Sequence, residues 1–78
     1  ERKSDATDLF RRWTEYQPKE ANAYDSLADA LEQNGKLEKA IEARKQAVKV
    51  AEQENDKYLT IYKENLELII KKYSEKKA

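Results

Sequence analysis

Gly35 and Pro18 are the only glycine and the only proline in this chain of 78 residues, and they constrain its fold more than any other feature. The rest of the sequence is rich in Ala, Leu, Lys, Glu and Gln, which favour helices. Glycine readily takes the left-handed conformation that often ends a helix, because it has no Cβ to clash. Proline cannot extend a helix interior. The sequence therefore predicts an all-α fold whose helices end at these two points.

Apolar residues recur at helical spacing in four segments, which predict helices over residues 4–16, 21–33, 37–52 and 55–75. Ser4 is expected to cap the first helix, and Asn55 or Asp56 is expected to cap the fourth. Only a few residues separate the second and third helices, so these two should pack as antiparallel neighbours.

The apolar faces of the two central helices predict the core of a single small domain that spans residues 1–78. We expect four of their side chains to be largely buried between helices: Tyr24, Leu27, Leu31 and Ile41.

The sixteen basic and sixteen acidic side chains cancel, so the chain offers no general electrostatic attraction to nucleic acid or to an anionic membrane. No apolar run approaches the length of a membrane span. Lys71, Lys72, Lys76 and Lys77 are basic residues of the kind that commonly complement the dipole at a helix C-terminus. We therefore expect neither nucleic acid nor membrane as a partner.

Catalysis is not expected, because the chain has no histidine to act as general base and no cysteine to act as nucleophile. Asp25, Asp29 and Glu32 share one face of the second helix. Ca²⁺ and Mg²⁺ need oxygen ligands that converge in a loop, and one straight helix edge does not provide them. The sequence indicates a solvated acidic face, with no metal and no cofactor, in a protein that is not an enzyme.

The chain also contains an internal repeat, because a shift of 34 residues aligns it with itself. Three pairs of positions match: Ala6 with Ala40, Tyr24 with Tyr58, and Leu27 with Ile61. Period and pattern together resemble the tetratricopeptide repeat (TPR) family. The anchors of the complete unit are Tyr24, Leu27, Ala28 and Leu31 in its first helix, Gly35 in its turn, and Ala40, Ile41 and Ala47 in its second helix.

This resemblance implies antiparallel helical hairpins that form a TPR-like α-solenoid fragment of about four helices. Residues 21–54 would be the complete unit, 4–17 the second helix of an incomplete unit, and 55–75 a C-terminal capping helix. Four residues depart from the family pattern. Arg44 replaces an aromatic residue, Trp13 and Tyr62 replace small residues, and Asn65 replaces an apolar one.

The TPR resemblance also implies a function, namely a protein interaction or docking module. In the family, the face of the first helix lines a groove that holds extended peptides. Here that face would present Asn22, Asp25, Asp29, Glu32 and Gln33. Because it carries three acidic side chains, it would suit a basic or amide-rich segment of a protein or peptide partner.

The stretch ANAYDSLADALEQNGKLEKAIE also resembles a TPR segment at the C-terminus of some bacterial serine hydrolases. This resemblance implies an alternative function, in which the chain is a structural appendage of a larger, hydrolase-like enzyme. It would then dock in cis on the preceding domain of the parent protein. The first residue is Glu1 rather than Met, which favours a segment excised from a longer chain.

Leu9, Phe10 and Trp13 form an apolar stripe on the first helix that is a candidate docking patch. Under the TPR resemblance, the helix that would cover them is missing. We expect them to face a preceding domain or to support a weak homodimer. In the alternative, Phe10 and Trp13 point into the core against the second helix.

Overall fold

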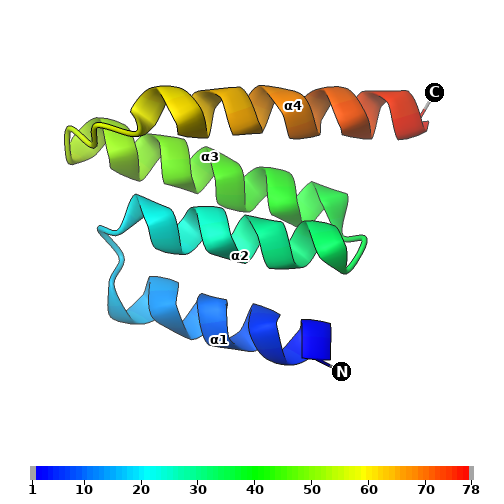
Figure 1. Ribbon diagram of the computed structural model, residues 1–78, viewed down its shortest axis with the longest axis horizontal. Helices are drawn as coiled ribbons and strands as arrows, with labels where there is room; N and C mark the ends of the chain where they lie inside the picture. The colour runs from blue at the N-terminus through cyan, green and yellow to red at the C-terminus, as the bar shows by residue number, and fades with distance from the viewer. Residues whose placement is uncertain (1, 78) are drawn as a thin grey trace.

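The computed structural model describes the backbone of residues 2–77 and the side chains of residues 6–76. Four α-helices follow one another: α1 (Arg2–Tyr16), α2 (Ala21–Gln33), α3 (Leu37–Gln53) and α4 (Leu59–Lys77). Residues 2–77 contain no β-strand, so this part of the chain is all-α, as the composition predicted. Consecutive helices run in opposite directions and lie side by side in chain order (Figure 1).

The helix boundaries agree with the sequence pattern in the centre of the chain and depart from it at the two outer helices. Helix α2 has the predicted bounds, and α3 ends at Gln53. Helix α1 already begins at Arg2, so the prediction that Ser4 caps it is wrong. Helix α4 begins only at Leu59, because the residues before it form a turn. Within that turn, Asp56 Oδ1 accepts a hydrogen bond from the backbone N–H of Tyr58 at 2.8 Å, so Asp56 stabilises the turn that precedes α4 instead of the first turn of the helix.

Helices α2 and α3 both end in a left-handed residue. Gly35 has a φ of 77°, and the N–H of Lys36 donates to the carbonyl of Leu31 at 2.9 Å. Asn55 has a φ of 55°, and the N–H of Asp56 donates to the carbonyl of Ala51 at 2.9 Å. Both turns are Schellman motifs, which satisfy carbonyls that a helix end would otherwise leave unpaired.

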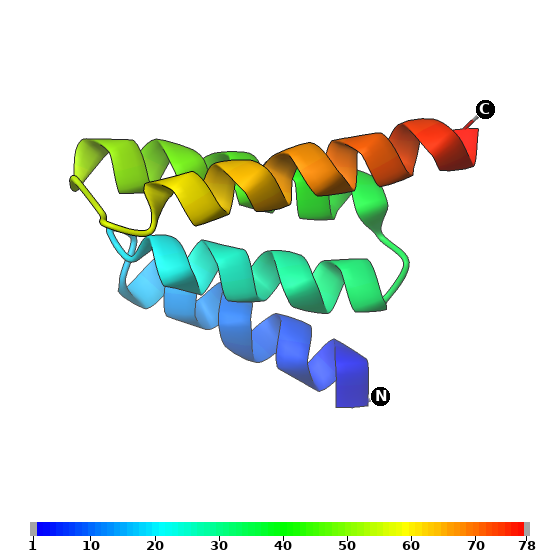
Figure 2. The same cartoon turned by 45° about the horizontal axis from the view of Figure 1, so that its top comes forward.

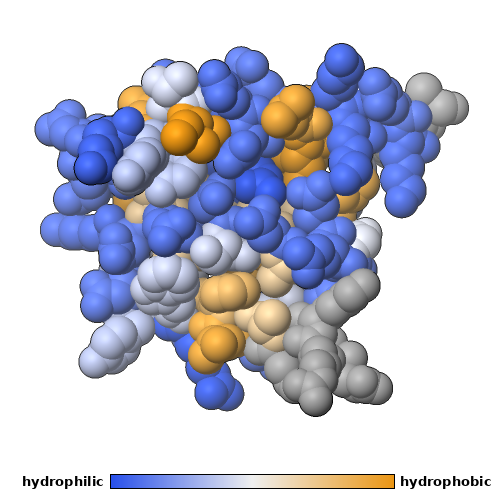
Figure 3. All heavy atoms as spheres, viewed as in Figure 1, coloured by the Kyte–Doolittle hydropathy of each residue, from blue (hydrophilic) through white to orange (hydrophobic). Residues whose placement is uncertain are grey.

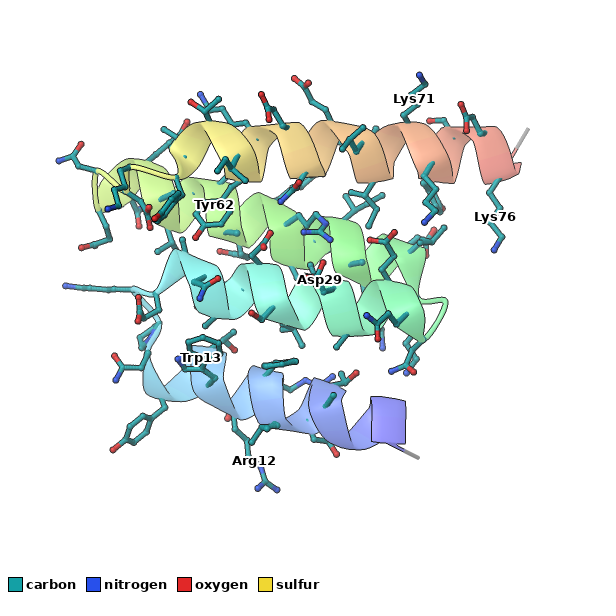
Figure 4. The ribbon with its side chains drawn as sticks, in the orientation of Figure 1. Arg12, Trp13, Asp29, Tyr62, Lys71 and Lys76 are labelled. Carbon is teal, nitrogen blue, oxygen red and sulfur yellow. The ribbon has the colours of Figure 1, made fainter. Side chains whose placement is uncertain are left out.

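The core lies between α2, α3 and α4 and is built largely from small side chains. One cluster of buried residues comprises Ala28, Leu31, Leu37, Ala40, Ala43 and Ile69. A second comprises Ala21, Ala47, Val50, Ala51 and Tyr62. The alanines let the helices approach closely, and Tyr62 points from α4 toward α2 and α3 (Figure 4). Of the four side chains expected in the core, Leu31 is buried, whereas Tyr24, Leu27 and Ile41 pack half-buried at its edges.

The two outer helices are each covered on one side only. Helix α1 packs on α2, and α4 packs mainly on α3 (Figures 1 and 2). Thr7 and Thr14 are the buried polar residues among the described side chains of α1. Thr7 Oγ1 accepts a hydrogen bond from Asn34 Nδ2 at 2.9 Å. The Cα atoms extend over 35 × 28 × 13 Å, so the stack is flat and its edges are open.

Candidate functional site

Arg44 of α3 lies among the acidic side chains of α2. Its Nη1 donates to Asp25 Oδ1 at 2.7 Å, and its Nη2 donates to Asp29 Oδ1 at 2.6 Å and to Glu32 Oε1 at 3.3 Å. Asp29 lies on the side of α2 that faces α3 (Figure 4). The Arg44 side chain is 7% exposed, and its Nε is buried with no hydrogen-bond partner among the described residues. The acidic face predicted from the sequence therefore carries a buried cation.

Lys72 connects this cluster to α4, since its Nζ donates to Glu32 Oε2 at 2.7 Å. We call Asp25, Asp29, Glu32, Arg44 and Lys72 the charge cluster. Its three carboxylates and two cations leave one net negative charge. The cluster joins α2, α3 and α4, so it holds three helices in register at the surface where α2 and α4 face each other.

The pKa directions in the cluster follow from burial and from these contacts. Burial raises the pKa of Asp25 above its usual value, although the charge of Arg44 opposes the shift. The hydrogen bond from Lys72 lowers the pKa of Glu32. Burial alone would lower the pKa of Arg44, but its hydrogen bond to Asp29 and its attraction to Asp25 outweigh burial and raise it. The guanidinium therefore stays charged, and Asp25 is the carboxyl group whose pKa burial raises in spite of the neighbouring cation.

Two hollows lie between α2 and α4, at the two ends of the charge cluster. The first, of about 450 Å³, is lined by residues that include Glu20, Asn22, Asp25, Tyr58 and Ile61. The second, of about 200 Å³, is lined by Glu32, Arg44, Asn65, Leu68, Ile69 and Lys72. We call the surface that contains both hollows the α2–α4 groove.

The α4 side of the groove presents exposed apolar side chains. Tyr58 and Ile61 are about half exposed, and Leu68 is 67% exposed. Figure 3 shows hydrophobic side chains standing over α4. The sequence reasoning did not include these residues in the groove. The internal repeat could have identified two of them, because it aligns Tyr58 and Ile61 with residues of α2.

The structure distributes the five predicted groove residues along α2. Asn22 and Asp25 line the first hollow, and Glu32 lines the second. Asp29 lies between them, bound to Arg44. Gln33 is exposed at the last position of the helix.

The three residues of the predicted docking patch lie together on α1. Leu9 is 64% exposed, whereas Phe10 and Trp13 are half-buried, with ring centroids 6.3 Å apart. With Arg12 and Tyr16 they line a hollow of about 490 Å³. Trp13 lies on the α2 side of α1, and Arg12 points away from α2 (Figure 4).

The described residues contain no group of three or more His, Cys, Asp or Glu side chains that could hold a metal ion. Within the same part of the chain, no helix combines the length and the apolar character needed to cross a membrane. The lysines of α4 do not share one face, since Lys71 and Lys76 point to opposite sides of the helix (Figure 4).

Comparison with protein-family models, with curated proteins and with solved structures gives no match for this chain. The resemblance to TPR proteins and to hydrolase-attached segments therefore stays a prediction from the sequence.

Proposed function

We propose that this chain is a protein-interaction module of TPR type, without catalytic activity of its own, that holds an extended peptide in the α2–α4 groove. The observation that carries the proposal is the set of exposed apolar side chains, Tyr58, Ile61 and Leu68, along a groove whose α2 wall carries the charge cluster, with its one net negative charge. Exposed apolar side chains in a concave, partly charged surface favour a protein or peptide ligand. The stacking of each helix on its chain neighbours, with Gly35 at the central turn, supports a TPR-like solenoid.

The spacing of the apolar side chains sets the length of the ligand. Tyr58 directly precedes α4, and helix rise places Leu68 about 15 Å from it along the helix axis. An extended chain advances about 3.3 Å per residue, so about five residues cover this distance. Alternate side chains of such a peptide point to the same side and would contact the apolar residues of α4.

The charge of the groove determines which side chains fit at the other positions of the peptide. The charge cluster, which includes Asp25, keeps one net negative charge, and Glu20 and Asp56 are further carboxylates at the first hollow. Lys57 lies at the same hollow and offsets part of this charge. A peptide that alternates apolar with basic or amide side chains is therefore the ligand that fits best. Because five residues bury little surface, we expect a Kd on the order of 0.1–1 mM.

The test is a nuclear magnetic resonance titration of the ¹⁵N-labelled chain with an amide-capped Leu-Lys-Leu-Lys-Leu peptide. We expect backbone amide shifts in the residues that line the groove, including Asn22, Ile61 and Leu68. The matching Leu-Glu-Leu-Glu-Leu peptide should bind at least tenfold more weakly, because its carboxylates meet the acidic wall.

Two matched variants separate the groove from the rest of the surface. Leu68→Lys places a charge among the apolar contacts and should weaken binding at least tenfold. Leu9→Lys changes an equally exposed leucine on α1, 64% against 67%, and should leave binding unchanged. Equal shifts with both peptides, or shifts confined to α1, would refute the proposal.

A further inference from the structure

One face of α1 forms an apolar surface that lies outside the α2–α4 groove. Its hollow of about 490 Å³ is lined by Leu9, Phe10, Arg12, Trp13 and Tyr16, and Arg12 is its one charged residue. Leu9 is 64% exposed and Tyr16 is 84% exposed. Figure 3 shows hydrophobic side chains gathered over α1 and its border with α2. We call these five residues the α1 face.

Nothing in the described part of the chain covers this face. Helix α1 packs on α2 through a different side, where Thr7 and Thr14 are buried and Thr7 binds Asn34. Trp13 is half-buried, and its ring lies close to that of Phe10. The apolar residues of the α1 face are therefore available to a partner without any change in the helix stack.

We propose that the α1 face binds the α1 face of a second copy of this chain, as an antiparallel helix pair about a two-fold axis that passes close to Trp13. This inference is independent of the peptide groove, which lies on α2 and α4.

The charges beside the face support a second copy as the partner. Arg12 and Glu15 are exposed and lie three positions apart, so they share one flank of the helix. In an antiparallel pair related by a two-fold axis, each flank faces the same flank of the other helix. With Trp13 near the axis, Arg12 of each copy lies opposite Glu15 of the other. The same register brings Leu9 of each copy close to Tyr16 of the other. The face is thus complementary to itself in charge and in apolar contact.

The size of the face sets the strength of the association. Helix α1 has 15 residues and is about 22 Å long. Interfaces that bury less than roughly 1,200 Å² are weak or transient, and a pair of helices of this length buries less than that. We therefore expect a dimer that forms and dissociates rapidly and that requires high protein concentration.

Sedimentation equilibrium of the full chain, from micromolar to near-millimolar concentration, measures this association. The wild type should fit a monomer–dimer equilibrium, and Leu9→Lys should weaken it at least tenfold. Leu68→Lys, the equally exposed leucine of α4, should leave it unchanged. A wild-type chain that stays monomeric throughout this range would overturn the proposal and leave the face to a preceding domain.

Charge reversal tests the register without changing an apolar contact. Arg12→Glu and Glu15→Arg should each weaken self-association about tenfold, because like charges then meet across the axis. The double variant should regain wild-type association. An equimolar mixture of the two single variants should form heterodimers in which every charged contact is again complementary. A mixture that associates no better than either variant alone would refute this antiparallel arrangement.

Discussion

Replacing Arg44 with leucine removes the guanidinium on which Asp25, Asp29 and Glu32 converge, and leaves their carboxylates in place. Breaking a buried ion pair by removing one partner commonly costs about 3–5 kcal/mol. The expected cost is smaller here, because the side chain of Asp29 is 60% exposed and Glu32 keeps its hydrogen bond from Lys72. Asp25, whose side chain is only 18% exposed, loses its closest cation. We expect Arg44→Leu to lower the free energy of unfolding by about 2–3 kcal/mol at pH 7.

The pH dependence of this loss identifies its cause. Burial already holds the pKa of Asp25 above its usual value of 3.8, and removing Arg44 removes the largest opposing influence. A carboxyl group whose pKa is higher in the folded state than in the unfolded state costs stability above the folded pKa. That cost disappears as the pH falls through the folded pKa toward 3.8. The difference between wild type and variant should therefore be smaller at about pH 4.5 than at pH 7.

Urea unfolding, followed by circular dichroism, measures the free energy of unfolding of wild type and variant at each pH. Lys45→Leu, which removes an exposed cation from the same helix, should cost less than about 0.5 kcal/mol at either pH. Arg44→Leu combined with Asp25→Leu should recover part of the loss, since the carboxylate that lost its cation is then also removed. If Arg44→Leu matched the wild type at both pH values, the charge cluster would not exist in solution.

Three further substitutions test the fold. Gly35→Val should cost about 1–2 kcal/mol in a thermal melt. The cost would come from the φ of 77° alone, because an added Cβ would meet nothing within 4 Å. An unchanged melting temperature would argue against the left-handed turn at Gly35. Leu31→Ala should lower the free energy of unfolding by about 2–5 kcal/mol in urea, and Leu27→Ala should lower it by less because Leu27 is only half-buried. A larger loss for Leu27→Ala than for Leu31→Ala would mean that the helix register is wrong. Asp56→Ala removes the hydrogen bond to the N–H of Tyr58 and should cost about 1 kcal/mol, and hydrogen exchange at that amide should rise only in this variant.

Local signals in the sequence were sufficient to predict the number of helices and the bounds of α2. Periodic apolar residues end at Gln33, and Gly35 provides the left-handed turn that follows. The same reasoning placed the start of α4 too early. Asn55 takes a left-handed φ of 55°, so it closes α3 instead of capping the next helix. A non-glycine residue in that conformation is uncommon, and periodicity carries no signal for it.

The charge cluster could not be predicted, because it depends on how far one long side chain reaches. In the repeat pattern, Arg44 is only a departure from an aromatic position. Its buried guanidinium depends on the carboxylates of α2, which lie at least 12 residues away in sequence. Contacts at that separation depend on how α2 and α3 dock, which a helical pattern does not determine. The exposure of Leu9 and Leu68 is likewise a property of open edges, which become visible only once the stack is assembled.

Because the helices pack chiefly on their chain neighbours, their contacts are mostly local in sequence. Local contacts require little loop closure, so folding should be fast. Helices α2 and α3 support each other and are each covered by an outer helix. Helix α1 packs on α2, whereas α4 packs on α3 and is also bound to α2 through Lys72 and Glu32. Opening should therefore begin with α1 detaching while α2 and α3 stay paired. Amide protons would then exchange earliest in α1 and latest in the central hairpin.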